Sequence, residues 1–513
     1  MKIPHRPNGL LVNAMWNGGS IAFTMVLSFV LTPILLRHLG TATYGTLILI
    51  WSISGILGTM NMGLGEATLR YVARYAAQDD VAGVNRVFGA VLSLYSVVCL
   101  TLVVSMFIGA PVVASWLNTP ADSVDLVSWL LRIASLSVAA TIIMSAFGAV
   151  PLALQRFDIA NKISVGSNLA RTIGYILFAM SGFSVAALVF WDLIIAIFVL
   201  GLMANAAKRF YPKLRMLPRF SFLGIKEIFG YSIFSFLTFF VHKFHRESGK
   251  LMLARFLGPG PVVYLATPDN IAQRFHEVIA GGIEASLPRF SAEDRVAEIE
   301  RLFWSTTWTG LSLSLIVFVP FVILVPDFLR LWISPDFSKL GGLVGQLLGI
   351  YLISQGGFTG PAAYFRGTGK PEIVTLIILG SLVITVISGI ILIPTYGPVG
   401  AAYAYLAGSA APFLGMTAGS LYAFGWSAAS RLVRNVVIPL VAAAAAGGIG
   451  LYVSTYIGTE SWPQFLASGL MIATVTASLV FGADCSINGA ESTSLALLRK
   501  IGRRLPFNVP QRT

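Results

Sequence analysis

Ten residues beginning at Val241 place a group of charged side chains in an otherwise apolar part of the chain. They read VHKFHRESGK, with Lys243, Arg246 and Lys250 at positions i, i+3 and i+7. This spacing puts three cations on one face of a helix, where they can bind an anion by charge-assisted hydrogen bonds. Glu247 can neutralise one of them, and the face then still carries net positive charge.

The length of the preceding apolar run predicts how deep these charges lie in a membrane. The run 228–241 has 14 residues and covers ~21 Å as a helix, whereas a hydrocarbon core is ~30 Å thick. The helix must therefore continue towards Leu257 and carry the charges near mid-depth. Ionisable groups at that depth face a water-filled cavity or a partner. The alternative is a helix that breaks near Val241 and leaves the charges in a surface loop.

Further ionisable residues lie inside apolar segments. Arg171 has no acid within a turn and is expected to face the same cavity. Arg274 either pairs with Glu277 or lines the cavity, and Arg132 either extends to the membrane surface or binds substrate. Gating or coupling residues are expected among the acids, which are Glu247, Glu277, Asp269, Glu66 and Glu284.

The sequence has no pattern typical of an enzyme or a metal protein. It lacks a GxSxG elbow, an HExxH helix and a phosphate-binding loop, and its two cysteines, Cys99 and Cys485, have no metal-site spacing. We therefore expect no enzymatic activity and no cofactor. A proton or sodium gradient remains open as the driving force.

The composition identifies a membrane protein that crosses the bilayer many times. Of the 513 residues, 56% are hydrophobic and 11% are charged, and the mean hydropathy is +0.80, whereas soluble domains carry about 25% charged residues. We expect an all-α fold of about fourteen spans: 10–36, 43–66, 87–116, 124–150, 162–181, 184–206, 228–257, 262–287, 304–326, 340–365, 371–394, 399–424, 435–457 and 464–484.

The distribution of basic residues predicts the orientation. With the N-terminus inside, 25 of the 35 Lys and Arg residues fall in cytoplasmic segments and five in outer loops. By the positive-inside rule both termini are then cytoplasmic. The net charge of +13 thus indicates this orientation and not a nucleic-acid partner.

Short motifs recur at a nearly constant offset. Glu66-Ala-Thr-Leu returns as Glu284-Ala-Ser-Leu, and RHLG at 37–40 returns as RFLG at 255–258, both 218 residues later; GFSVAA at 182–187 is matched by GPVGAA at 397–402. Six spans separate the copies, so both have the same orientation. This predicts two parallel six-helix repeats with a substrate path between them, followed by two extra helices. The expected divisions are a first bundle 1–206, a basic linker 207–227, a second bundle 228–424, two helices 425–484 and a basic cytoplasmic tail 485–513.

The opening of the chain resembles a known family. Asn13, the stretch PILLRHLG at 33–40 and Tyr44-Gly45 are similar to the polysaccharide or O-antigen flippases of the multidrug/oligosaccharidyl-lipid/polysaccharide exporter superfamily. The fourteen spans, the two bundles and the short outer loops extend this resemblance over the whole chain.

The resemblance implies a flippase for an undecaprenyl-pyrophosphate-linked oligosaccharide, acting by alternating access in the bacterial inner membrane. Lys243, Arg246, Arg274 and Arg171, with Lys250 and Arg132, would then meet the anionic pyrophosphate. The expected partners are this lipid-linked substrate, membrane lipids and other membrane proteins of polysaccharide assembly. The alternatives are a lipid II-type or other lipid or drug exporter of the superfamily and, from another class, a membrane-embedded glycan polymerase or ligase.

Overall fold

The protein is built from helices. The computed structural model describes residues 10–61, 63–293 and 295–488, and the side chains of 10–25, 222–235, 427, 487 and 488 lie outside the description. Most of the predicted tail and the Asn13 side chain are therefore not covered. The elements are α1 (Leu10–Gly58), η1 (Thr59–Asn61), α2 (Leu64–Ala77), α3 (Val81–Trp116), η2 (Ala121–Ser123), α4 (Val124–Ala153), α5 (Phe157–Met180), α6 (Val185–Phe210), α7 (Phe222–Leu257), α8 (Val262–Glu284), α9 (Leu287–Ala292), α10 (Val296–Trp332), α11 (Pro335–Gly367), α12 (Pro371–Gly408), α13 (Ala410–Phe424), α14 (Ser427–Leu432), the π-helical turn η3 (Val433–Val437), α15 (Ile438–Ile457) and α16 (Trp462–Asn488).

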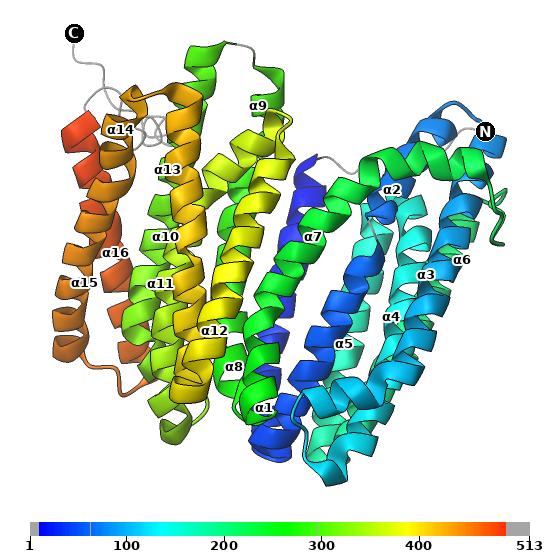
Figure 1. The fold of residues 1–513 in the computed structure, drawn as a ribbon, viewed down its shortest axis with the longest axis horizontal. Coiled ribbons are helices and arrows are strands. Elements are labelled where there is room, and N and C mark those ends of the chain that lie inside the picture. The colour runs from blue at the N-terminus through cyan, green and yellow to red at the C-terminus, as the bar shows by residue number, and fades with distance from the viewer. Residues whose placement is uncertain (1–9, 62, 294, 489–513) are drawn as a thin grey trace. The chain divides into compact units, whose positions relative to one another are not determined.

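The chain forms two compact units, Met1–Val263 and Tyr264–Thr513. Figure 1 draws the first in blue to green and the second in green to red. We expected the first bundle to end near residue 206. In the structure α7 belongs to the first unit, where it packs against α1, α2 and α3. The charged segment of α7 is therefore positioned by helices of the first repeat.

The first unit has a buried core between α2, α3, α4 and α6. The rings of Phe88 and Phe147 meet edge to face, with centroids 5.3 Å apart. Asp80 caps the start of α3, because its Oδ1 accepts a hydrogen bond from the backbone N–H of Gly83 at 2.8 Å. Helices α1, α5 and α7 pack against the helices of this core.

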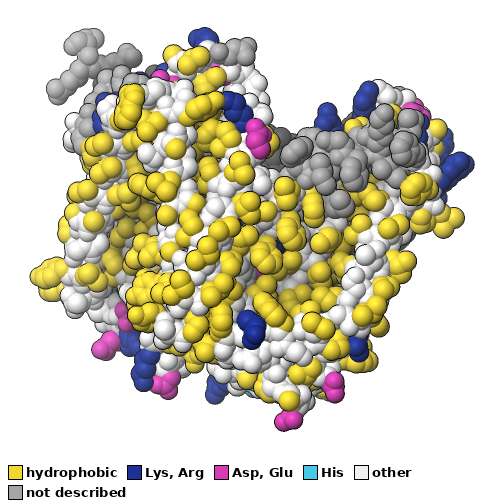
Figure 2. Space-filling model, viewed as in Figure 1, with side chains coloured by type: hydrophobic (Ala, Val, Ile, Leu, Met, Phe, Trp, Pro, Cys, Tyr) yellow, Lys and Arg dark blue, Asp and Glu magenta, His cyan; other side chains and the backbone are white. Residues whose placement is uncertain are grey.

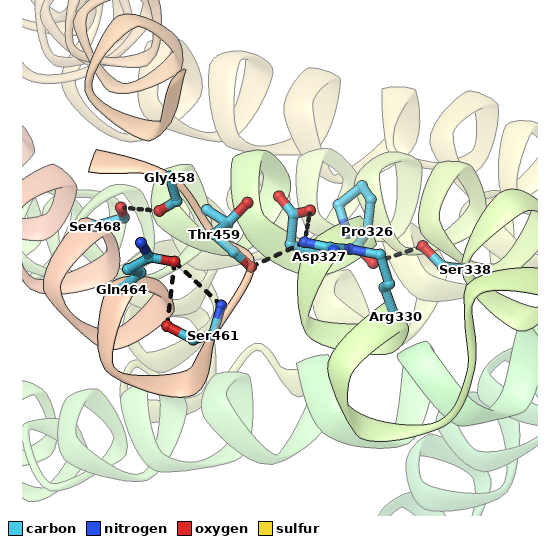
Figure 3. Close-up of polar contacts among 9 residues, drawn as sticks. All are labelled: Pro326, Asp327, Arg330, Ser338, Gly458, Thr459, Ser461, Gln464 and Ser468. Carbon is cyan, nitrogen blue, oxygen red and sulfur yellow. Dashed lines mark hydrogen bonds and ion pairs between the residues drawn. The ribbon is translucent and has the colours of Figure 1, made fainter. Parts of the chain in front are cut away.

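In the second unit the last two helices pack on α10. Arg330 at the end of α10 contacts Oδ1 of Asp327 at 3.1 Å and donates to the carbonyl of Thr459, in the loop between α15 and α16, at 2.9 Å (Figure 3). In the first turn of α16, Gln464 Oε1 accepts from the backbone N–H and hydroxyl of Ser461, the last residue of that loop. The two helices that stand outside the predicted repeat are thus fastened to the second unit by polar contacts at a helix end.

Four glycines with left-handed φ mark equivalent breaks in the two halves of the chain. Gly40 (φ 75°) and Gly258 (φ 80°) end the two RxLG motifs, and Gly182 (φ 73°) and Gly397 (φ 58°) begin the other matched pair. At Gly40 and Gly397 the backbone leaves helical geometry inside α1 and α12. Residues with a Cβ rarely adopt these angles, so the repeated glycines correspond to repeated turns.

The helices are apolar along their middle parts. Figure 2 shows hydrophobic side chains over this face of each unit, with charged side chains gathered towards the helix ends. Among the described residues nine stretches are long and apolar enough to cross a membrane. The all-α class is confirmed for the described residues, and every predicted span overlaps a helix. The first two predicted spans both overlap α1, on either side of Gly40, and the second runs on into α2. The count of fourteen stays a prediction.

Candidate functional site

The charged segment of α7 is part of one continuous helix. α7 runs from Phe222 to Leu257 without interruption, so the alternative of a break near Val241 does not occur. Within it, Lys243 Nζ lies 2.8 Å from Oε1 of Glu247, and Lys250 Nζ lies 2.7 Å from Oε2 of the same carboxylate. The helix itself brings these groups together, because their spacings are i, i+4 and i, i+3.

We call Lys243, Glu247 and Lys250 the α7 ion cluster. The three side chains differ in exposure. The side chains of Glu247 and Lys250 are 5% exposed, whereas that of Lys243 is 30% exposed. Two ammonium groups share one carboxylate, so the cluster has a net charge of +1. A buried charge is tolerated when it is paired, and removing one partner leaves a strongly unfavourable group. Lys243 is therefore the member that a ligand can reach.

Arg246 lies half-buried one turn from Lys243, beside the buried His245. The hydroxyl of Ser248 donates to the His245 carbonyl at 2.7 Å. The predicted cationic face is thus present on α7, and it is held among buried polar groups.

Lys243 lies directly against α1. A Cβ added to Gly55 would come within 2.7 Å of the Lys243 Cε and 2.9 Å of its Nζ. Such contacts are closer than real Cβ atoms allow, so a side chain at this position would make the end of the lysine shift. The ammonium group therefore lies against the backbone of α1, within the first unit.

Gly55 is also part of the wall of a cavity of about 570 Å³ in the first unit. The volume lies in the range of small-molecule pockets. The lining comes from the end of α1, the η1 turn and the start of α2, together with parts of α4 to α7, and its described residues are Gly55, Gly58, Thr59, Asn61, Gly63, Gly65, Glu66, Leu69, Met144, Ser145, Gly148, Ala149, Leu152, Ala160, Met203, Phe236 and Phe239.

The predicted acid Glu66 belongs to this cavity. It is exposed, in the first turn of α2, and forms no ion pair with a described residue. Nearby, the Tyr95 hydroxyl donates to the carbonyl of Asn61 at 3.3 Å and lies 3.1 Å from the hydroxyl of Ser145. These bonds join the 3-10 turn η1 to α3 and α4, so the cavity has a polar edge held by hydrogen bonds.

Arg171 has a partner that the sequence reasoning missed. Its Nε lies 2.9 Å from Oδ1 of Asp192 on α6, and Trp51 Nε1 on α1 donates to Oδ2 at 3.2 Å. The ring of Tyr175 lies 5.6 Å from that of Trp51. Asp192 is an acid inside the predicted span 184–206, and this depth was the signal that could have singled it out.

The remaining predicted residue of the first unit contacts backbone. Arg132 on α4 donates from Nε to the carbonyl of Phe107 on α3 at 3.1 Å. This contact ties two neighbouring helices together and uses one of the five N–H donors of the guanidinium group.

The predicted residues of the second unit form separate pairs. Arg274 lies 3.3 Å from Glu277, with side chains 44% and 43% exposed, which is the intrahelical alternative. Asp269 is buried and accepts from Gln273 at 3.3 Å. Glu284 pairs with Arg366 on α11 at 3.0 Å.

The predicted set thus falls into local groups: the α7 ion cluster with Arg246, Glu66 in the cavity, the Arg171 pair and the Arg132 contact in the first unit, and three pairs in the second. Within the described ranges, no three His, Cys, Asp or Glu side chains are grouped so that they could hold a metal ion.

Comparison with known proteins gives a consistent result. The family model described as "Polysaccharide biosynthesis protein" matches residues 10–293. Over 502 residues the chain is 20% identical to the "Uncharacterized membrane protein EpsK" of Bacillus subtilis (strain 168). The alignment covers 93% of this chain and 95% of that protein.

Solved structures share the fold. "Lipid II flippase MurJ, inward closed conformation" matches with a TM-score of 0.69 and 16% identity over 92% of this chain and 99% of that one. The inward-facing conformation of a multidrug resistance MATE family transporter of the MOP superfamily matches with a TM-score of 0.68 and 15% identity, over 78% of this chain and 94% of that one. At these identities the similarity shows that the fold is that of a multi-pass membrane transporter.

Proposed function

Since the chain belongs to the family of polysaccharide biosynthesis proteins, we propose that it is a flippase for an undecaprenyl-pyrophosphate-linked oligosaccharide. It moves this substrate from the cytoplasmic to the periplasmic leaflet of the bacterial inner membrane by alternating access, with both of its own termini in the cytoplasm. The similarity in fold to a lipid II flippase supports a substrate of the same chemical class.

The observation that carries this proposal is the α7 ion cluster. α7 carries two lysines and an arginine within eight residues. In the proposed arrangement these groups provide a counter-charge for an anion that must leave water. A pyrophosphate is such an anion, and its oxygens accept charge-assisted hydrogen bonds from ammonium and guanidinium groups.

Glu247 suggests how the anion is bound and released. While no substrate is present, its carboxylate holds both lysines. An arriving pyrophosphate takes over the partly exposed Lys243, and Glu247 keeps the buried Lys250. The exchange replaces one ion pair by another, so no lysine is left unpaired during binding or release.

The other predicted residues have supporting roles in this proposal. Arg246 adds a second donor group beside Lys243, and Lys250 stays with Glu247. Arg132, Arg171 and Arg274 are further contacts of the substrate in this proposal, and before it arrives Arg171 is paired with Asp192 and Arg274 with Glu277. The lipid tail stays in the bilayer while the head group crosses. A proton or sodium gradient drives the return of the empty carrier, with Asp192, Asp269 or Glu277 as the coupling group.

The proposal is tested by following the substrate in cells that lack the gene. Deletion is expected to remove the surface polysaccharide and to leave lipid-linked oligosaccharide in the cytoplasmic leaflet, where lectins added to intact spheroplasts do not reach it. The wild-type gene restores both readouts. A variant with Lys339→Gln is the matched control, because this lysine lies in an exposed ion pair outside the cluster.

Normal surface polysaccharide in the deletion strain, with no lipid-linked intermediate retained inside, contradicts the proposal. Retention of single lipid-linked repeats in the periplasmic leaflet, where lectins reach them, would favour the polymerase alternative, and retention of complete lipid-linked polymer would favour the ligase alternative. Loss of lipid II export without loss of polysaccharide would favour the lipid II-type alternative.

A further inference from the structure

The cavity of the first unit has features that suit a ligand different from an anion. We propose that it binds the sugar portion of the substrate next to the pyrophosphate, and that it selects neutral or amino sugars against acidic ones. This inference rests on the proposed function, because it assigns the glycan of the same lipid-linked molecule to a second site. It adds a specificity-determining site to the α7 ion cluster.

The cavity lies next to Lys243 on α7. On α7, Phe236 and Phe239 line the cavity, and Lys243 follows at i+7 and i+4, on the same helical face. At 1.5 Å per residue Lys243 is about 6 Å beyond Phe239 along the axis. Its ammonium group touches Gly55, which itself lines the cavity. A group bound at Lys243 is therefore adjacent to the cavity.

The polar part of the cavity wall suits a ligand that donates hydrogen bonds. No lysine or arginine is among the described lining residues, and the one charged side chain is Glu66. α1 ends at Gly58 and continues directly into η1. The carbonyls of its last turn keep a second lone pair even where they already accept one bond, as the Ile56 carbonyl does from the Thr59 hydroxyl at 2.6 Å. With Gly55 and Gly58 in the wall, no side chain of these two residues screens this backbone. Carboxylate and carbonyl oxygens accept hydrogen bonds, and hydroxyl or ammonium groups of a sugar donate them.

The apolar part of the cavity wall suits the face of a sugar ring. The rings of Phe236 and Phe239 come from α7, and Met144 and Met203 come from α4 and α6. A pyranose ring presents C–H faces to such surfaces and directs its hydroxyls to the polar edge. A uronic acid would place a second carboxylate in the cavity with Glu66, and like charges repel in a site with restricted water.

The two repeats differ in the surroundings of their matched glutamates. Glu66 and Glu284 are matched by the 218-residue offset, yet Glu284 is paired with Arg366 and Glu66 lines the cavity. Only the first of the two carboxylates is thus placed to meet a ligand in a described cavity. Glu284 is therefore the control position for substitutions of Glu66.

The binding experiment uses the full-length protein in nanodiscs and three probes: farnesyl pyrophosphate, farnesyl-pyrophosphoryl glucose and farnesyl-pyrophosphoryl glucuronic acid. We expect the glucose compound to bind about tenfold more tightly than the glucuronic acid compound, since one unit of like charge at about 6 Å at an effective dielectric constant near 40 corresponds to about this factor. Glu66→Gln should reduce the preference to within about twofold. Glu284→Gln should leave it unchanged.

A second pair of variants tests the volume of the cavity. A Cβ at Gly148 has only the Met203 sulfur within 4 Å, at 3.9 Å, and one at Gly201 on α6 meets nothing. Gly148→Leu fills the cavity and should lower the affinity for the glucose compound to that for farnesyl pyrophosphate. Gly201→Leu, outside the cavity, should not. Gly148→Val replaces the leucine variant if the melting temperature of the latter falls.

The outcomes separate this inference from the proposed function. If Lys243→Gln weakens all three probes alike while Gly148→Leu and Glu66→Gln change nothing, the sugar site is refuted and the flippase proposal stands. If the folded wild-type protein binds none of the probes, the pyrophosphate site itself fails. Binding of tetraphenylphosphonium that requires Glu66, without any preference among the sugar probes, would show a site for lipophilic cations and overturn the inference.

Discussion

The Nζ atom of Lys250 lies 2.7 Å from Oε2 of Glu247, and both side chains are only 5% exposed. Because Lys243 holds the other oxygen, removing the carboxylate breaks both of these ion pairs, whereas removing Lys250 breaks one and leaves the other intact. Glu247→Gln is therefore expected to destabilise the protein by about 3 kcal/mol, and Lys250→Met by less. Melting temperatures in detergent and abundance in the membrane measure the difference. Equal melting of the two variants would contradict this order.

The role of Arg246 is separable from its contribution to folding. If it binds a pyrophosphate, Arg246→Lys keeps the charge but loses the forked geometry and should retain partial transport. Arg246→Ala should do worse, and Arg246→Glu should abolish transport, since it repels the anion. Surface-glycan complementation is measured beside membrane abundance. Full activity of the glutamate variant at normal abundance would remove Arg246 from the mechanism.

The pair between Arg171 and Asp192 joins α5 to α6. A double-mutant cycle with Arg171→Gln and Asp192→Asn should give a coupling energy of about 1 kcal/mol, a modest value because the arginine is 36% exposed. Asp192→Asn can still accept the Trp51 hydrogen bond, so its own effect on stability should be the smaller one. A coupling energy near zero would show that the two groups act independently.

Replacing glycine by alanine should have opposite effects at a left-handed glycine and at a helical one. Gly40 has φ 75° and ψ 170°, and a Cβ there meets nothing within 4 Å, so Gly40→Ala should destabilise through backbone strain alone, by about 1–3 kcal/mol. Gly109 lies inside α3 with equal space. Gly109→Ala should stabilise by about 0.5–1 kcal/mol. Thermal unfolding of both variants checks the sign, and a stabilising Gly40→Ala would refute the argument.

The predicted orientation can be read by thiol labelling. The chain has only Cys99 and Cys485, so a cysteine-free background needs two substitutions. Glu460→Cys, in the exposed loop between α15 and α16, should react with an impermeant maleimide in intact spheroplasts. Lys213→Cys, in the exposed basic linker, should react only after permeabilisation. The reverse pattern would place both termini outside.

Much of the fold follows from local properties of the sequence. Apolar runs of membrane-spanning length must be helical, because the bilayer offers no partner for free backbone groups. The α7 ion cluster is equally local, since helical spacing alone brings Glu247 to both lysines. The repeated glycines were also recognisable, because only glycine takes left-handed turns without strain.

Contacts between helices were decided by the tertiary structure. Arg171 and Asp192 are 21 positions apart on different helices, and nothing in their local sequence specifies that the two helix faces meet. The cavity likewise depends on residues from α1, α2, η1 and four further helices. The packing of α7 with the first unit, which brings Lys243 against Gly55, had no local signal. Apolar surfaces attract without direction, so a sequence specifies which faces are buried, and only the packed chain decides which residues meet there.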